Sequence, residues 1–256
     1  MFSVRITTKW HGNTNMNVLY VNLIITGLLV WFHGIDYLTI FCTSSFLHLI
    51  IESGLSLAGI RKGKVFVYGK KLPRVADIFL RSLVEGPAFC VPAFFTADQF
   101  MADNLVHSSL MAIGVVGLAS LYMGLSDRSN LKRLGPNESP IFSRRAMTKP
   151  GAVMLLALLN TICVVAVMLI PDTYKSHAIT YLLSYSGLVM LFYLINYSLG
   201  VRIIQFYDSE KGEFVKPGIG VQAAGLTYDS AYEMALLISP AYWVAHYCGL
   251  FEYSTI

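Results

Sequence analysis

The chain reads Thr43-Ser-Ser-Phe-Leu-His-Leu-Ile-Ile-Glu-Ser-Gly-Leu-Ser-Leu57, and this stretch places an imidazole and a carboxylate, His48 and Glu52, in a segment otherwise apolar enough to span a bilayer. Ser44, His48, Glu52 and Ser56 follow one another at intervals of four residues, so that in a helix their side chains share one face. An ionisable group near the bilayer centre costs about 2.5–3.5 kcal/mol on insertion scales. We therefore expect the pair to have a function.

The composition of the chain is typical of a membrane protein. Of its 256 residues, 55% are hydrophobic and 13% are charged, and the mean hydropathy is +0.58. About 20 apolar residues cross the hydrocarbon core of a bilayer. Seven such windows are expected, at 17–32, 37–60, 78–96, 104–124, 151–171, 177–200 and 231–250. The prediction is an all-α, polytopic membrane protein with seven transmembrane helices, in which a tail (1–16), a single seven-helix domain (17–250) and a short tail (251–256) follow one another.

The basic residues give this arrangement an orientation. If the windows are helices, their loops alternate between two faces, and all of the 19 Lys and Arg residues except Arg81 and Lys175 lie on the face of the N-terminal tail. The positive-inside rule then predicts a cytosolic N-terminus and a lumenal or outside C-terminus. The net charge of +4 is explained by this topology. We expect the basic loops to meet membrane lipids and expect no nucleic-acid partner.

Two carboxylates of neighbouring helices are expected at the same depth. With a rise of about 1.5 Å per residue, Glu52 lies roughly 12 Å and Glu85 roughly 10 Å from the cytosolic ends of their helices. Arg81 lies one turn shallower than Glu85, and His48 lies one turn deeper than Glu52. Arg81 is equally compatible with a structural ion pair to Glu85, or with a side chain that snorkels to the interface.

Polar and aromatic side chains of the last two windows are candidates for the same pocket. Tyr185 and Asn196 lie in the window 177–200, and Glu233 and Trp243 lie in the window 231–250. Glu233 also fits an interfacial helix cap, and Trp243 also fits an interface or packing role. Asp98, at the outer end of the third helix, is expected to be a loop residue.

The segment from His48 to Leu57 resembles the His-Leu-Val-Ile-Glu-Gly and following Ser-Leu residues of the emopamil-binding-protein family, the sterol Δ8–Δ7 isomerases of the EXPERA superfamily. This resemblance implies that the imidazole and the carboxylate are catalytic. Glu85-Gly-Pro87 resembles the Trp-Gly-Pro of that family, but Ile78 stands where the family has its third-helix Glu, and the family has five helices. In size and helix number the chain is similar to the seven-helix membrane terpene cyclases of fungal meroterpenoid and indole-diterpene pathways.

Both resemblances imply acid–base carbocation chemistry. A carboxylic acid in an apolar site protonates an alkene or epoxide, aromatic faces and carboxylates stabilise the cation, and a base removes a proton. The expected function is that of an isoprenoid cyclase or isomerase of the endoplasmic-reticulum membrane, acting on a meroterpenoid-type substrate. Glu52 is expected to donate the proton, His48 to relay it, and Glu85 to serve as the second acid or base.

The expected substrate is a hydrophobic isoprenoid or sterol. The candidate substrate-binding residues are Arg81, Tyr185, Asn196, Glu233 and Trp243, and neither a cofactor nor a metal is expected. A sterol Δ8–Δ7 isomerase, a proton-coupled transporter and a lipid-binding membrane protein are the alternatives. A metal-dependent seven-helix lipid hydrolase is disfavoured, because Tyr242 stands where an i, i+4 histidine partner of His246 is needed. The oligomeric state is left open.

Overall fold

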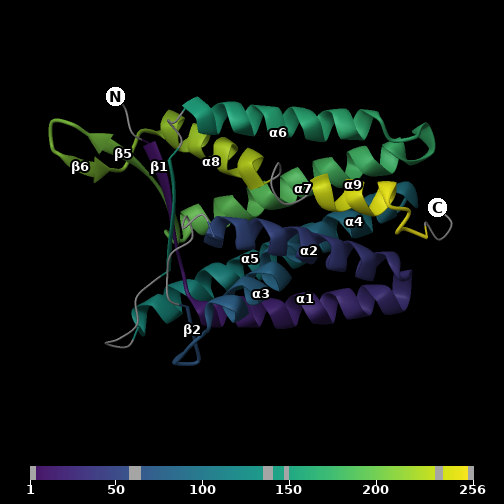
Figure 1. Cartoon of the computed structure of the whole chain (residues 1–256), viewed down its shortest axis with the longest axis horizontal. Helices are drawn as coiled ribbons and strands as arrows, with labels where there is room; N and C mark the ends of the chain where they lie inside the picture. Colours follow the sequence, from purple (N-terminus) through teal and green to yellow (C-terminus); the bar gives the residue numbers. More distant parts are fainter. Residues whose placement is uncertain (1–3, 58–64, 135–140, 147–149, 234–238, 253–256) are drawn as a thin grey trace.

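The computed structural model describes residues 4–57, 65–134, 141–146, 150–233 and 239–252. Its helices form an elongated bundle, and a small antiparallel sheet lies at one end of it (Figure 1). In chain order the elements are β1 (Val4–Trp10), α1 (Gly12–His33), α2 (Asp36–Leu57), β2 (Phe66–Val67), β3 (Lys70–Lys71), α3 (Arg74–Glu85), α4 (Pro87–Met101), α5 (Leu105–Lys132), β4 (Ile141–Ala146), α6 (Pro150–Met168), α7 (Asp172–Ser198), β5 (Arg202–Asp208), β6 (Glu213–Val215), α8 (Ile219–Glu233) and α9 (Ser239–Tyr247).

The sheet departs from the predicted all-α fold. The chain is mostly helical, at 74%, but β1 lies between β4 and β5, and β6 completes the order β4-β1-β5-β6 with antiparallel pairing throughout. The N-terminal segment was predicted to be a tail. It is ordered as a strand because Ile6 lies opposite Ile204 and these two side chains pack with Val4 in a small apolar cluster.

Three helical stretches are long and apolar enough to cross a membrane, among the residues that the structure describes. They are Gly12–His33, Arg74–Met101 and Asp172–Ser198. These stretches overlap the predicted windows 17–32, 78–96 and 177–200. Length and hydropathy therefore support a membrane protein, and the count of seven spans and the orientation of the termini stay proposals.

Two of the predicted windows are not single helices. The window 78–96 is divided into α3 and α4, because Pro87 has no N–H to continue the α3 hydrogen-bond ladder and instead occupies the first turn of a new helix. Gly86 between them keeps right-handed helical angles, so the two helices together form the 28-residue stretch noted above. In the window 231–250, α8 ends at Glu233 and the nine-residue α9 begins at Ser239, while residues 234–238 lie outside the described part of the chain.

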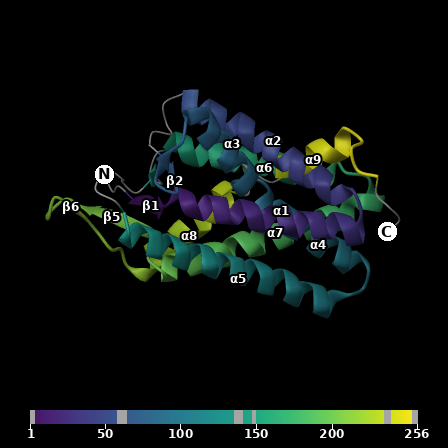
Figure 2. The ribbon, with the colours of Figure 1, turned by 90° about the horizontal axis from the view of Figure 1, so that it is seen from below.

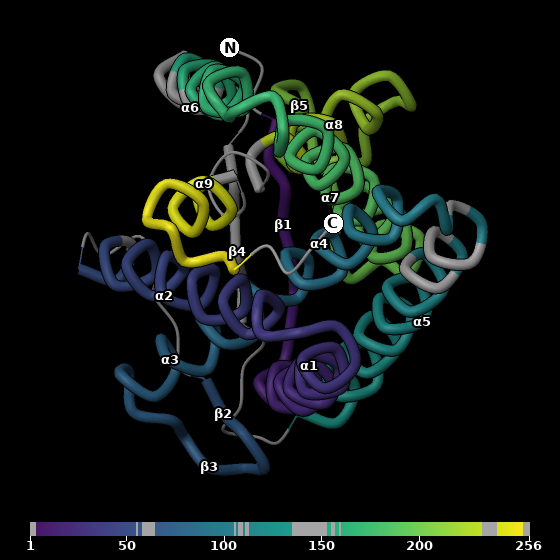
Figure 3. The backbone as a smooth tube through the Cα atoms, turned by 90° about the vertical axis from the view of Figure 1, so that its right-hand side faces the viewer, coloured from purple at the N-terminus to yellow at the C-terminus, as the bar shows by residue number. Residues whose placement is uncertain are grey.

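The main core lies among α2, α4, α7 and α9. Seen along the bundle, these four helices lie close together, whereas α6 lies to one side of them (Figure 3). Their fully buried side chains include several large aromatic rings, among them Tyr37, Phe94, Tyr181 and Tyr242. From the perpendicular direction, β1 and β5 lie at one end of the bundle and α9 lies toward the other (Figure 2). The core is thus closed by aromatic packing at the end that is far from the sheet.

Asp127 connects α5 to the junction between β1 and α1. Its Oδ1 accepts a hydrogen bond of 2.8 Å from the backbone N–H of His11, and the side chain is almost fully buried. Asp127 lies three residues beyond the apolar window 104–124. Burial raises the pKa of the Asp127 carboxyl to about 7, although the hydrogen bonds from Thr14 and His11 act in the opposite direction.

This carboxyl should make stability depend on pH. Between pH 4 and 7 the folded protein retains the Asp127 proton and the unfolded chain has lost it, so the free energy of unfolding should fall as pH rises through this range. The expected loss is on the order of 1–4 kcal/mol. Thermal unfolding in detergent at a series of pH values measures it, and Asp127→Asn should flatten this part of the profile. An identical pH profile in the variant would contradict the assignment.

Candidate functional site

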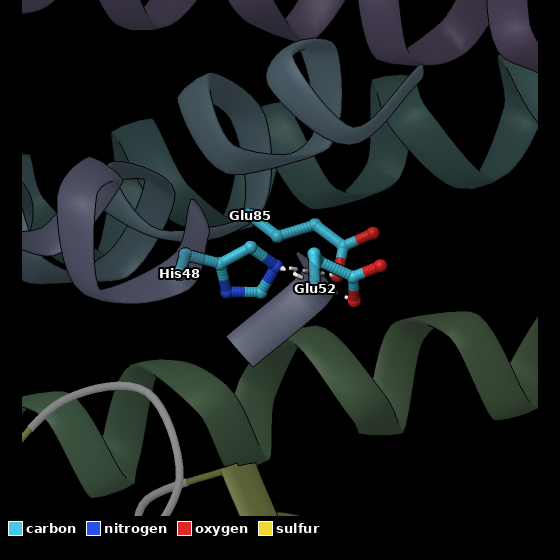
Figure 4. Close-up of side chains that lie close together, drawn as sticks. All are labelled: His48, Glu52 and Glu85. Atoms are coloured by element: carbon cyan, nitrogen blue, oxygen red, sulfur yellow. Dashed lines mark ion pairs between the residues drawn. The ribbon is translucent and has the colours of Figure 1, made fainter. Parts of the chain in front are cut away.

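The structure brings His48, Glu52 and Glu85 together where α2 meets the end of α3 (Figure 4). His48 Nε2 lies 3.4 Å from Glu85 Oε2 and 3.7 Å from Glu52 Oε1. The side chains of His48 and Glu52 are each only 2% exposed, whereas that of Glu85 is 24% exposed. The site therefore consists of a buried imidazole whose Nε2 faces two carboxylates, one of which reaches the surface of the fold.

A close approach of the two backbones holds this arrangement. A Cβ atom at Gly86 would lie 2.6 Å from the backbone oxygen of Ser44, so glycine is needed where the end of α3 touches α2. Asn22 of α1 adds a hydrogen bond of 3.0 Å from its side-chain nitrogen to the backbone oxygen of Val84. These contacts fix the position of Glu85 beside the helix that carries His48.

Arg81 lies beside the cluster, next to Glu52. Its Nη1 lies 3.9 Å from Glu52 Oε2, and its Nε donates a hydrogen bond of 2.9 Å to Asp77 Oδ1. The guanidinium also lies over the ring of Trp10, 4.6 Å from the centroid. Arg81 is only 4% exposed, so its side chain does not snorkel to an aqueous surface as one of the sequence-based interpretations proposed.

The imidazole of His48 is held by packing and charge. Both of its ring nitrogens are buried, and neither has a hydrogen-bond partner among the described residues. Its distances to the two carboxylates are those of ion pairs and exceed the usual hydrogen-bond range of about 2.7–3.2 Å. A buried, uncompensated polar atom is costly. A bound group that contacts either ring nitrogen would remove this cost.

The same three residues offer ligands for a divalent cation. One ligand atom from each of His48, Glu52 and Glu85 can lie within 4.8 Å of the other two, and an imidazole with two carboxylates suits Zn²⁺, Mn²⁺ or Fe²⁺. The guanidinium of Arg81 already places a positive charge beside Glu52, which weakens cation binding there.

Chelation distinguishes a cluster that holds protons from one that holds a metal ion. If protons rather than a metal balance the charge of the cluster, elemental analysis of the purified protein should find well below one equivalent of transition metal. A stoichiometric metal that is lost both on chelation and in His48→Ala would contradict the metal-free assignment.

The other predicted site residues lie in different surroundings. Tyr185 is fully buried on α7, and its ring lies 5.8 Å from that of Phe89, centroid to centroid. The Asn196 side chain donates a hydrogen bond back to the Phe192 carbonyl of its own helix. Trp243 packs edge-on against Tyr242 in the core near α9. Glu233 ends α8, and its side chain lies outside the described part of the chain. The substrate-binding role of these residues stays a prediction.

Sequence reasoning missed a second polar cluster. Asp98 was expected in a loop, but it lies in the last turn of α4 and pairs with the buried His177 of α7 at 2.8 Å. His177 opens the apolar window 177–200. The rule that singled out His48, an ionisable group in an apolar segment, could also have singled out His177.

An apolar pocket of about 370 Å³ opens between α1, α4 and α5. Its lining includes Pro87 and Ala88, which follow Glu85 directly after Gly86, and the rings of Phe89 and Phe192. None of the three cluster residues lines it. The pocket is thus adjacent to Glu85 in the sequence, but the cluster side chains do not form part of its lining.

Comparison of the chain with protein-family models, curated proteins and solved structures finds no match.

Proposed function

We propose that the protein is a membrane-embedded isomerase or cyclase that protonates an alkene or epoxide of an isoprenoid substrate. The observation that carries this proposal is the buried cluster in which His48 lies 3.4 Å from Glu85 and 3.7 Å from Glu52. Acid-catalysed chemistry on a hydrocarbon needs an acid, a base and exclusion of water. The cluster supplies an acid and a base whose side chains are largely shielded from water.

The charges of the cluster support a proton-holding site. Arg81 pairs with both Glu52 and Asp77, and Glu85 interacts electrostatically with the same buried guanidinium. When all three carboxylates are ionised, this set has an excess of negative charge, which is costly in a low-dielectric interior. Bound protons remove the excess. Glu52, the more buried carboxyl, is the proposed proton donor, His48 passes the proton on, and Glu85 is the proposed second acid or base.

The pocket supports a hydrophobic substrate. Its lining is almost entirely apolar, and its volume of about 370 Å³ is in the range of small-molecule sites. The rings of Phe89 and Phe192 lie 5.2 Å apart, centroid to centroid, in an edge-to-face arrangement at this pocket. Aromatic faces attract cations. We propose that the isoprenoid chain lies here, with its reacting end directed along α4 toward Glu85.

The proposed membrane arrangement follows the charge asymmetry of the loops. Seven spans, a cytosolic N-terminus and a lumenal C-terminus place all of the 19 basic residues except Arg81 and Lys175 on the cytosolic side. The proposed location is the endoplasmic-reticulum membrane, where a hydrophobic substrate can enter laterally. The three apolar helical stretches support insertion into a membrane.

A conversion assay tests the proposal. Microsomes that contain the protein are incubated with a panel of isoprenoid alkenes, terminal epoxides and sterols. The extracts are then separated by chromatography, and the masses of the products are determined by mass spectrometry. Isomerisation and cyclisation conserve every atom, so the expected product has the mass of its substrate and a different retention time. If no substrate is converted and the protein instead moves a solute together with protons in liposomes, the transporter alternative replaces this proposal.

A further inference from the structure

Asp98 joins a buried hydrogen-bonded cluster at the end of the bundle far from the sheet. Its carboxylate accepts a hydrogen bond from Tyr37 and lies 2.8 Å from His177 Nε2, and His177 Nδ1 lies 2.8 Å from the hydroxyl of Tyr242. Tyr37, His177 and Tyr242 are at most 1% exposed, whereas the Asp98 side chain is 29% exposed. A carboxylate at the surface thus leads directly to a buried imidazole and two buried phenols.

Buried polar side chains continue from this cluster toward His48. Tyr181 lies one turn after His177 on α7, and its ring centroid is 4.8 Å from that of Tyr242. The side chain of Cys90 on α4 interacts with the side chains of both Tyr181 and Ser44. All three of these side chains are completely buried. Cys90 therefore bridges a polar stripe on α7 and the Ser44 stripe on α2.

The last step leads from Ser44 to the His48–Glu52–Glu85 cluster. Ser44 lies one turn before His48 on the same face of α2, where side chains four residues apart are neighbours. His48 Nδ1 is buried and has no hydrogen-bond partner among the described residues. A rotation of the imidazole, or one water molecule, can join this nitrogen to the Ser44 hydroxyl. Beyond His48 comes Glu85, whose side chain is again partly exposed.

This series of side chains, Asp98, His177, Tyr242, Tyr181, Cys90, Ser44, His48 and Glu85, is called the polar file below. Asp98 and Glu85 lie about 20 Å apart along α3 and α4 at the rise of a helix, which is a large part of the roughly 30 Å hydrocarbon core of a bilayer. Both end groups are carboxylates that reach the surface of the fold, and the six groups between them are at most 2% exposed. The polar file therefore runs through the buried interior of the bundle, from one partly exposed carboxylate to the other.

We propose that the polar file conducts protons through the bundle and connects the His48–Glu52–Glu85 cluster with the opposite side of the membrane. An imidazole, hydroxyl or thiol can accept a proton on a lone pair and release another, so each member ends a transfer chemically unchanged after it reorients. Chains of ionisable and hydroxyl groups inside membrane proteins are typical of such relays. The relay does not depend on the proposed reaction, but it would reload Glu52 between turnovers.

Proton flux into liposomes tests the file without any isoprenoid substrate. Purified full-length protein is reconstituted with an entrapped pH-sensitive dye, and an acid pulse is applied outside. Wild-type protein should acidify the lumen faster than protein-free liposomes do. Tyr181→Phe and Cys90→Ala, which each remove one relay group and little volume, should slow the flux to nearly that of protein-free liposomes.

Two matched controls distinguish the relay from a change in folding. Tyr37→Phe removes a buried hydroxyl that bonds Asp98 but is a side branch of the file, and Cys42→Ala removes an exposed thiol from α2. Both should conduct as the wild type does, and Asp98→Asn should resemble Tyr181→Phe. The proposal is overturned if wild-type liposomes acidify no faster than empty ones, or if properly reconstituted Tyr181→Phe and Cys90→Ala conduct normally. Either outcome leaves the conversion assay unaffected.

Discussion

Glu52→Gln should lower product formation about 10²–10⁴-fold, the usual contribution of a general acid. The amide keeps the shape of the side chain but cannot donate a proton to an alkene or epoxide. Because Glu52 is almost fully buried beside His48 and Arg81, no solvent molecule is expected to replace it. The measurement is the initial rate of conversion at equal amounts of folded protein, determined by size-exclusion chromatography in detergent.

Matched substitutions locate the effect in the cluster. Glu213→Gln changes an exposed carboxylate of β6 and should leave the rate unchanged. Glu85→Gln should lower the rate as well, because Glu85 is the closer carboxylate to His48. Normal turnover by folded Glu52→Gln would remove Glu52 as the proton donor.

Arg81→Met should destabilise the protein by about 3–5 kcal/mol, the usual cost of removing one partner from a buried ion pair. The substitution leaves Glu52 without its guanidinium neighbour and also removes the contact between Arg81 and the Trp10 ring. Trp10 belongs to β1, so the loss should loosen the attachment of the sheet to the bundle. The shift in denaturant or thermal unfolding in detergent measures the effect.

A double substitution tests the physical reason for this loss. If the cost arises from an uncompensated carboxylate, Arg81→Met combined with Glu52→Gln should be more stable than Arg81→Met alone, because the amide carries no charge. Exactly additive losses would show that the two side chains do not interact, and would contradict the geometry of the cluster.

The pairing of His48 with Glu52 and Glu85 could be anticipated from the sequence. Their helical spacing placed His48 and Glu52 on one face, and counting the rise along two antiparallel helices placed Glu85 at the depth of Glu52. Local periodicity carries this information because α2 and α3 run in opposite directions along the bundle. The ion pair of Arg81 with Glu52 was not anticipated, because the spacing along the sequence favours Glu85 of the same helix as the partner of Arg81.

The sheet and the Asp98 cluster could not be anticipated in this way. β1 pairs with strands from two distant loops, Ile141–Ala146 and Arg202–Asp208, and neither partner is visible in local hydropathy. Asp98, His177 and Tyr242 come from three helices whose neighbours in the bundle are set by packing. The backbone contact between Gly86 and Ser44 likewise decides how closely α3 approaches α2.

The isotopic content of a product formed in D₂O tests the central claim most directly. Protein equilibrated in D₂O is given an isoprenoid substrate that contains alkenes and no epoxide, and the product is analysed by mass spectrometry. Protonation by an exchangeable carboxyl predicts one solvent deuterium bound to carbon in each product molecule. Conversion of the substrate with no deuterium on carbon, from protein whose acidic groups have fully exchanged, would contradict the account.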